Sequence, residues 1–239
     1  MINNTKIEIC IGNVLDAIIA SKYPIDRIEL NSALELGGLS PSLETLIYLK
    51  EKIETKICCM VRPRGGDFYY NNIEYELMLK QAKNFLENRA DGIVFGFLNL
   101  DKTIDIDRTK KMVDLIHSYQ KEAIFHKAFD EVEDSDKAIQ SLIELKVDRI
   151  LTSGKQSSEN ILIGCELIND LQNKYGHLIE LLPGGGVRID NILDVVYKAN
   201  TKQVHMTSKQ SNPNGYLCLD EKQLQILLKE LETNEYLNN

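Results

Sequence analysis

The sequence predicts an α/β fold, a single (β/α)8 barrel of the TIM type, and three observations lead to it. Short apolar segments alternate with helical patterns along all 239 residues, which favours parallel pairing of the strands. The alternation repeats eight times, which favours a closed barrel over an open doubly wound sheet. The turns after the strands are richer in glycine, proline and charge than the turns before them, and barrel active sites lie at that end.

Each element follows from its local pattern. Strands are predicted where a short apolar run is bounded by turn-forming residues, at 6–10, 27–31, 56–62, 92–97, 123–129, 149–153, 179–182 and 203–207. Helices are predicted where apolar residues recur at helical spacing, at 13–22, 43–53, 73–88, 107–119, 135–145, 159–175, 190–198 and 220–232. No linker interrupts the series, so we expect one domain over residues 1–232 and a loose tail over 233–239.

Composition excludes several classes of partner. The net charge of −8 argues against a nucleic-acid surface or an anionic membrane as the main partner. No apolar run approaches the roughly 20 residues of a membrane span, and the N-terminal residues 1–4 do not read as a signal peptide. We therefore expect a cytoplasmic protein whose five cysteines, an odd number without paired spacing, are reduced thiols.

The most informative segment is residues 58–68, where a short apolar run stops at Arg62, Pro63, Arg64, a glycine pair and Asp67. Pro63 cannot continue the ladder of a central strand, and the glycines permit conformations that other residues avoid. Because arginine stays charged at working pH, both arginines must meet solvent, a carboxylate or an anion. We expect a strand that surfaces into a binding loop, in which Asp67 orients Arg62 or Arg64.

Strand alternation predicts which side chains line the barrel interior. Residues of a barrel strand point in turn to the interior and to the helix layer, and polar ones should point inward because the helices need apolar contacts. This choice places inside Glu8, Cys10, Glu29, Asn31, Cys58, Met60, Arg62, His126, Asp130, Thr152 and His205. Unpaired buried charge is costly, so we interpret the set as a functional pocket. The alternative is an ion-pair network, such as Glu29 with Arg62, that only fills the barrel.

One function for this pocket is catalysis. The catalytic candidates are the inward ionisable residues Glu8, Glu29, Arg62, His126, Asp130 and His205. Glu8 or Glu29 would act as the base, either histidine as the acid, and the arginine as the stabiliser of developing charge. By strand parity Lys127 faces away from the pocket, so no lysine is placed to form a Schiff base.

A glycine run after the seventh strand, Gly184, Gly185 and Gly186, predicts an anion site. Its backbone N–H groups can face an anion, and phosphate sites recur near strands seven and eight of barrels. The alternative is a run that merely turns tightly. Basic residues also gather at the predicted strand tops of this acidic chain, at Arg62, Arg64, Lys127, Lys155 and Arg188. With Arg64, Asp67 and Thr152 as further ligand-binding candidates, they favour a small anionic substrate, phosphorylated substrates included.

A second function is metal binding. Cu(I) prefers thiolate and thioether ligands, and Cys10, Cys58 and Met60 share the inward parity. Cys58 and Met60 rise on one face of their strand about 7 Å apart. The same residue types are also common core fillers. A harder divalent metal such as Zn or Mn is the alternative, held by oxygen and nitrogen ligands from Glu8, Glu29, His126, Asp130 and His205.

Several motifs resemble the CutC family. Residues 7–10 (IEIC), 26–30 (DRIEL) and 37–42 (GGLSPS) are similar to its start, and residues 60–68 (MVRPRGGDF) to its most distinctive segment. Residues 125–130 (FHKAFD), 149–154 (RILTSG) and 184–187 (GGGV) follow in the same order, and His205 resembles the histidine of its closing strand. The resemblance covers roughly residues 6–208, and the order of several long motifs makes it specific.

The resemblance implies a cytoplasmic TIM-like barrel assigned to copper homeostasis. One position departs from the family, because relatives commonly carry a cysteine where this chain has Asn31. If that cysteine holds copper, this protein lacks one ligand. Two hypotheses remain open: a cytosolic protein that handles Cu(I), and a barrel enzyme for a small anionic substrate. In either case we expect a homo-oligomer.

Overall fold

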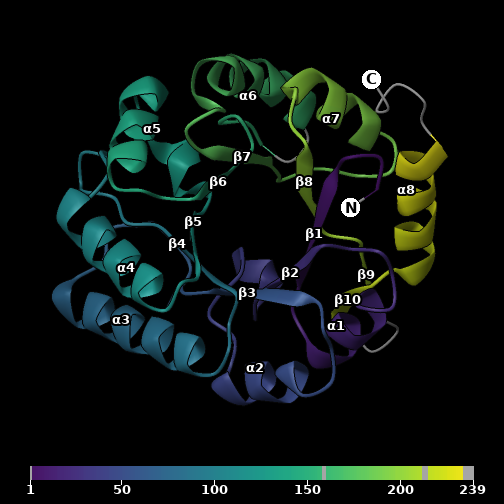
Figure 1. Cartoon of the computed structure of the whole chain (residues 1–239), viewed down its shortest axis with the longest axis horizontal. Helices are drawn as coiled ribbons and strands as arrows, with labels where there is room; N and C mark the ends of the chain where they lie inside the picture. The colour runs from purple at the N-terminus through teal and green to yellow at the C-terminus, as the bar shows by residue number, and fades with distance from the viewer. Residues whose placement is uncertain (1, 158–159, 212–214, 234–239) are drawn as a thin grey trace.

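The eight predicted strands form one parallel sheet that curls into a barrel, as Figure 1 shows. The structure is a computed structural model that describes residues 2–157, 160–211 and 215–233. Neighbouring strands follow the order β7-β6-β5-β4-β3-β2-β1-β8. Their bounds are β1 Lys6–Ile11, β2 Arg27–Leu30, β3 Lys56–Met60, β4 Gly92–Phe95, β5 Glu122–Phe125, β6 Arg149–Thr152, β7 Glu180–Pro183 and β8 Gln203–Met206. The predicted fold class is confirmed.

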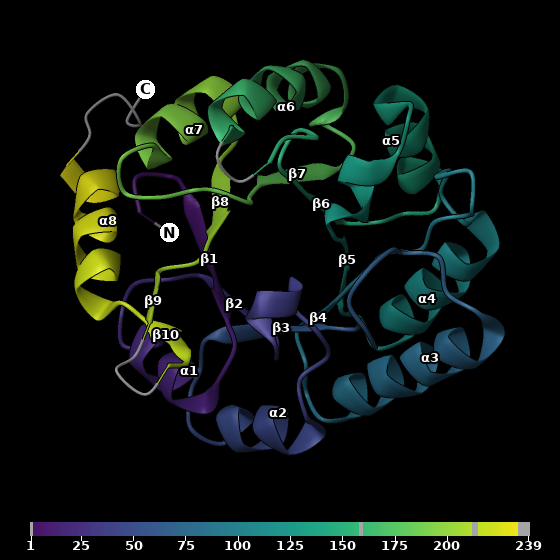
Figure 2. The same ribbon diagram turned by 180° about the vertical axis from the view of Figure 1, so that it is seen from behind.

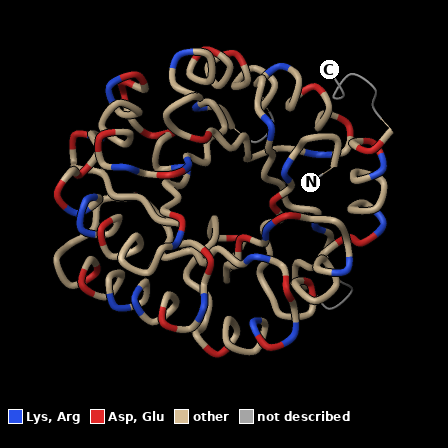
Figure 3. Tube along the Cα trace, in the orientation of Figure 1, with Lys and Arg blue, Asp and Glu red and all other residues tan. Residues whose placement is uncertain are grey.

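The helices form the outer layer, and their bounds are α1 Val14–Ala20, α2 Leu43–Lys50, α3 Asn72–Glu87, α4 Ile106–Ser118, α5 Ser135–Glu144, α6 Ile161–Tyr175, α7 Ile192–Ala199 and α8 Glu221–Thr233. Several begin at side-chain caps that satisfy first-turn N–H groups; Asn71 and Glu74 form a full capping box at α3. Figure 3 shows acidic and basic residues interspersed along this layer. No helix in the described part is long and apolar enough to cross a membrane.

Two predicted boundaries need comment. Glu159, the predicted first residue of the sixth helix, lies outside the described residues, and α6 begins at Ile161. Thr233, which we assigned to a loose tail, is the last residue of α8, whereas residues 234–239 lie outside the described part. The tail prediction therefore concerns at most those six residues, and the structure leaves it as a prediction.

The sequence did not predict a hairpin between the last strand of the barrel and α8. Its strands are β9 Lys209–Ser211 and β10 Leu217–Leu219, which pair antiparallel. The backbone N–H of Leu219 donates to Asp16 of α1 at 2.7 Å, which fastens the hairpin over the start of the chain. Figure 2 shows β9 and β10 beside α1. Strands of three residues are too short to leave a readable alternation of apolar and polar residues.

The Gln203 side chain joins the two ends of the sheet, between which the described residues form no backbone pairing. β7 and β8 are the two ends of the strand order, and they lie side by side. Gln203 of β8 donates from Nε2 to the backbone oxygen of Leu181 and to Glu180 on β7, both at 3.2 Å. Its Oε1 accepts from Arg27 on β2 at 2.9 Å. One amide thus links three strands across this gap.

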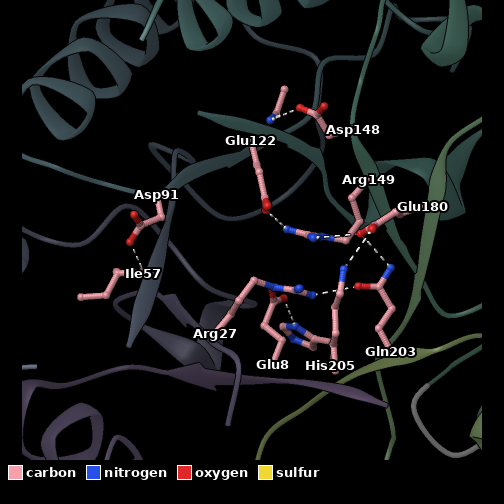
Figure 4. Close-up of polar contacts among 12 residues, drawn as sticks. Glu8, Arg27, Ile57, Asp91, Glu122, Asp148, Arg149, Glu180, Gln203 and His205 are labelled. Carbon is pink, nitrogen blue, oxygen red and sulfur yellow. Dashed lines mark hydrogen bonds and ion pairs between the residues drawn. The ribbon is translucent and has the colours of Figure 1, made fainter. Parts of the chain in front are cut away.

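Charged and polar side chains fill the barrel below the mouth (Figure 4). We call this set the barrel floor; it comprises Glu8, Arg27, Glu122, Arg149, Glu180 and Gln203. The Nε of Arg27 lies 2.8 Å from Glu8, and Arg149 donates to Glu122 at 2.6 Å and to Glu180 at 3.2 Å. Arg149 is 1% exposed, and its partners offset the desolvation of its charge. The floor is an ion-pair network inside the barrel, as the alternative interpretation supposed. Its pairs, however, do not include the suggested pair of Glu29 with Arg62.

Candidate functional site

A cavity of about 330 Å³ opens at the carboxyl ends of the strands, where barrel active sites lie. Eight of the predicted site residues line it: Cys10, Glu29, Met60, Arg62, His126, Gly185, Gly186 and His205. Asn31 lines it as well, together with residues that sequence reasoning did not select, among them Leu34, Phe68, Thr207 and Lys209. The other predicted site residues, Glu8, Cys58, Arg64, Asp67, Asp130, Thr152 and Gly184, lie outside this lining.

Three ligand-type side chains from adjacent strands meet on one wall of the cavity, and we call Cys10, Glu29 and His205 the ligand cluster. One potential metal-binding atom from each lies within 4.8 Å of the other two. The pairing register explains the meeting, because Cys10 of β1 lies opposite Glu29 of β2. Asn31 holds the arrangement together: its Nδ2 donates to Glu29 Oε2 at 2.8 Å and to the sulfur of Cys10 at 3.4 Å.

Glu8 lies directly below the cluster and orients His205. Its Oε1 lies 2.8 Å from His205 Nδ1, while Nε2 of that ring lies 3.9 Å from Glu29 (Figure 4 shows the contact with Glu8). Burial alone would raise the pKa of Glu8, but the hydrogen bond with His205 and the charge of Arg27 outweigh it and hold the pKa far below its ordinary value. For His205, burial lowers the pKa, yet Glu29 and Glu8 together raise it above its usual range.

The two remaining cluster groups resist ionisation. Burial raises the pKa of Glu29, and the nearby Glu8 charge adds to the effect. Burial raises the pKa of the Cys10 thiol well above its ordinary value, and the adjacent Glu29 raises it further. Cys10 therefore carries its proton at neutral pH, and a metal ion must displace that proton in order to bind.

The predicted soft-ligand set is divided. Cys58 packs with Met60, Val94 and Ile124 in a small apolar cluster inside the barrel, and burial raises the pKa of its thiol to about 12. Cys58 belongs to no group of three metal-capable side chains among the described residues. Met60 lines the cavity, as Cys10 does. Cys59 packs in the main core with the helices, as parity predicts.

Arg62 is a buried cation without a carboxylate partner in the described part of the chain. It is 6% exposed, and its guanidinium donates to the backbone oxygens of Leu36, Gly38 and Gly66 at 2.9–3.1 Å. Its Nε has no hydrogen-bond partner. The pair with Glu29 that served as the alternative to a functional pocket is absent from the described ion pairs, and Asp67 pairs with Arg64, not Arg62, at 3.1 Å.

His126 is a neutral donor at the cavity wall. Its Nδ1 accepts from the N–H of Ala128 at 3.1 Å, so the ring proton resides on Nε2, which is buried without a partner. Burial and the charge of Arg62 lower its pKa to about 3. Phe68 packs on the ring with 4.7 Å between centroids. His126 can therefore donate a hydrogen bond throughout the neutral range without carrying charge.

The orientation predicted for Lys127 is wrong. The fifth strand ends at Phe125, and Lys127–Glu131 form a 3-10 helix, so strand parity no longer applies. Lys127 lines the cavity, and its Nζ lies 3.9 Å from Asp130. The same Nζ packs against Gly185, because a Cβ added at Gly185 would lie 2.9 Å from it. Sequence reasoning could have found it only by placing the strand end correctly.

Asp130 anchors a loop and does not face the cavity. Its carboxylate accepts from Thr152 Oγ1 at 2.5 Å, from Ser153 Oγ at 2.8 Å and from the N–H groups of Ser153 and Lys155. Thr152 in turn accepts from the N–H of Gly154. These contacts shape the loop after β6, so the structure assigns Asp130 and Thr152 a supporting position behind Lys127.

A ring of eight parallel strands alternating with helices defines a TIM-barrel protein, and in this one an ionisable pocket lies at the carboxyl ends of the strands. The chain belongs to the CutC family, which matches residues 5–210. A family protein CutC of Treponema denticola is 41% identical over 221 residues, covering 89% of this chain and 88% of that protein. One from Vibrio vulnificus is 34% identical over 209 residues, covering 87% and 83%. The predicted resemblance is confirmed.

Solved structures agree on the fold. A CutC from Streptococcus agalactiae, provisionally named a copper homeostasis protein, superposes with a TM-score of 0.78 at 31% identity, covering 84% of this chain and 98% of that one. Phosphoribosylanthranilate isomerase from Thermotoga maritima superposes with a TM-score of 0.63 at 13% identity, covering 96% and 100%. The second likeness shows the barrel fold alone.

Proposed function

We propose that this protein handles copper and binds the ion at the mouth of its barrel, through the ligand cluster of Cys10, Glu29 and His205. The observation that carries the proposal is the convergence of three ligand atoms within 4.8 Å from three adjacent strands. The copper assignment comes from the name given to the Streptococcus agalactiae relative.

The donor set fits copper, although it differs from the all-sulfur set that the sequence suggested. Thiolate and thioether ligands suit Cu(I), and imidazole suits copper in general. Cys10 supplies the thiolate, His205 the imidazole, and Met60 offers a thioether from the lining of the same cavity. The family resemblance implies that relatives commonly carry a second cysteine where this chain has Asn31, which orients Cys10 and Glu29 by hydrogen bonds. With one thiolate in place of two, we expect weak or transient binding, as delivery of a cargo ion requires.

We would test the proposal by titrating the reduced protein with Cu(I) against a competing chelator. The expected result is one equivalent of copper, with affinity reduced at least about tenfold in Cys10→Ser and in His205→Phe, because each removes one ligand. Cys218→Ser is the matched control, since that thiol lies on the β10 strand outside the cavity lining. Binding that is indifferent to Cys10 and His205, or lost equally in the control, would refute the cluster as the copper site.

Metal affinity should also rise with pH. The raised pKa of Cys10 means that its thiol loses a proton when metal binds, so binding competes with protons across the neutral range. We expect apparent affinity to increase by up to about tenfold for each pH unit between pH 6 and 8. A Cu(I) competition titration at three pH values measures the slope, and a flat profile would mean that no thiolate binds the ion.

The second candidate function is catalysis on a small anionic substrate. The specific observation is that Arg62, Lys127 and Lys209 line the same cavity, which has room for more than one ion. In this mechanism Glu29 would be the base, because its raised pKa makes it a better proton acceptor than Glu8, whose pKa is lowered. His205, hydrogen-bonded to Glu8, would be the acid, and Arg62 would stabilise developing charge.

A further inference from the structure

We propose that the cavity binds a small hydroxylated organic anion in one orientation, with its oxyanion held by Arg62, His126 and Lys127 and its hydroxyl group directed to Glu29. The inference rests on the second proposed function and specifies its ligand class. It does not require copper.

The first step is the uncompensated charge of Arg62. Its guanidinium is buried, and its partners among the described residues carry no negative charge: they are three backbone carbonyls, the Tyr70 phenol and the face of Phe68, 5.1 Å from Cζ to the ring centroid. Carbonyls satisfy the N–H groups but do not neutralise the charge, and an isolated buried charge is unfavourable. Arg149, by contrast, is also buried but is paired with two glutamates. An anion bound in the cavity would give Arg62 what Arg149 already has.

The second step is the donor set beside Arg62. The Nε of Arg62 and the Nε2–H of His126 are both buried without partners, and both residues line the cavity. Lys127 brings an ammonium group to the same cavity, where it lies against Gly185. Two N–H donors and a cation, from the segments after β3 and after β5, are the groups that bind a carboxylate or phosphate.

The third step is the asymmetry of the cavity. The opposite wall, formed by β1, β2 and β8, carries His205 and Glu29, the one carboxylate among the described residues of the lining, and Lys209 beyond β8 lies near Cys10. A volume of about 330 Å³ holds roughly ten water-sized groups, more than one oxyanion fills. The remainder of the ligand therefore reaches the Glu29 wall, where a carboxylate accepts a hydrogen bond from a hydroxyl group. The ligand class is a hydroxy carboxylate or a hydroxylated phosphate monoester.

Four probes separate these features in metal-free protein kept in chelator. Glycerate and glycerol 3-phosphate carry both an oxyanion and hydroxyl groups, propionate lacks the hydroxyl groups, and glycerol lacks the oxyanion. We expect glycerate or glycerol 3-phosphate to bind at least about tenfold more tightly than propionate, with no binding of glycerol, in calorimetric titrations. Which of the two binds more tightly identifies the oxyanion.

Two variants then test the location. Arg62→Lys keeps the charge but removes the guanidinium donors, and His126→Asn keeps an acceptor for the Ala128 N–H but has no atom at the position of Nε2. Each should weaken binding at least about tenfold, while Lys102→Met, outside the cavity lining, should not change it. The comparison of probes in the unaltered protein needs no variant, so misfolding of either variant leaves the test intact.

Several results would overturn the inference: no oxyanion binds the metal-free protein, propionate binds as tightly as the hydroxylated probes, or binding survives in both variants. The Cu(I) titration of Cys10→Ser is read separately, so failure of the copper proposal and failure of this one are distinguishable. Binding of a hydroxylated anion that Cys10→Ser leaves unchanged would support the inference alone.

Discussion

Glu8 and Glu29 are buried carboxylates on neighbouring strands, yet their surroundings move their pKa values in opposite directions. Glu8 receives hydrogen bonds or charge from His205 and Arg27, whereas Glu29 has burial and a like charge against it. The sequence predicted both as inward residues by parity. It could not distinguish them, because the difference depends on which charged side chains lie next to each carboxylate, and those neighbours are set by strand register.

Glu8 should govern the acid stability of the fold. Its folded pKa lies below the ordinary value of 4.5, so its contribution is fully present above pH 4.5 and is lost as pH falls toward the folded pKa. We expect Glu8→Gln to destabilise the protein by about 3 kcal/mol at neutral pH, because Arg27 then lacks its charged partner. Below pH 4.5 the difference from the unaltered protein should shrink.

Urea unfolding at several pH values measures this difference. Glu51→Gln, at the exposed C-terminal end of α2, is the control and should change neither the stability nor its pH dependence. A difference that stays constant from neutral pH down to the acid transition would show that Glu8 is not held ionised by the fold.

At the scale of elements, parity was informative within strands and misleading beyond them. Cys10 and Glu29 point inward and Cys59 faces the helices, as alternation requires. The prediction failed at Lys127 because the strand had already ended at Phe125 and the chain had entered a 3-10 helix. The end of a short apolar run is hard to read, since residues such as Ala128 and Phe129 are apolar in either structure.

The loop between β2 and α2 contains a glycine that packs on Asn31, the residue that orients two members of the ligand cluster. Gly38 has φ +85°, and a Cβ there would lie 2.5 Å from Asn31 Oδ1. We expect Gly38→Ala to destabilise the fold by about 2 kcal/mol and to displace the Asn31 amide that orients Cys10 and Glu29. Thermal unfolding and the Cu(I) titration check the two effects.

Gly215→Ala is the matched control, because Gly215 has φ +84° and no atom of the described residues lies within 4 Å of an added Cβ. It should show the cost of backbone strain without the contact, roughly 1 kcal/mol. Equal effects of the two substitutions would mean that contact between Gly38 and Asn31 does not matter.

At the scale of the whole molecule, Gln203 links β7 and β8 where the backbone ladder stops. Gln203→Met keeps the volume but leaves Arg27 and the Leu181 carbonyl without this partner. We expect a loss of about 2 kcal/mol in unfolding free energy and faster amide exchange in β7 and β8 than in β3 and β4. Gln225→Met, on the exposed face of α8, is the control. Uniformly faster exchange across all strands would argue against a local weak point.

The barrel floor also decides how the mouth can be used. Glu8, Arg27 and Arg149 pack across the interior, so the barrel is closed below the cavity and forms no channel. Whatever enters must leave by the same rim, so arrival of the next molecule waits for departure of the last. Residues at the opening, Lys127 and Lys209 among them, are therefore the positions at which to look for effects on the rates of ligand entry and release.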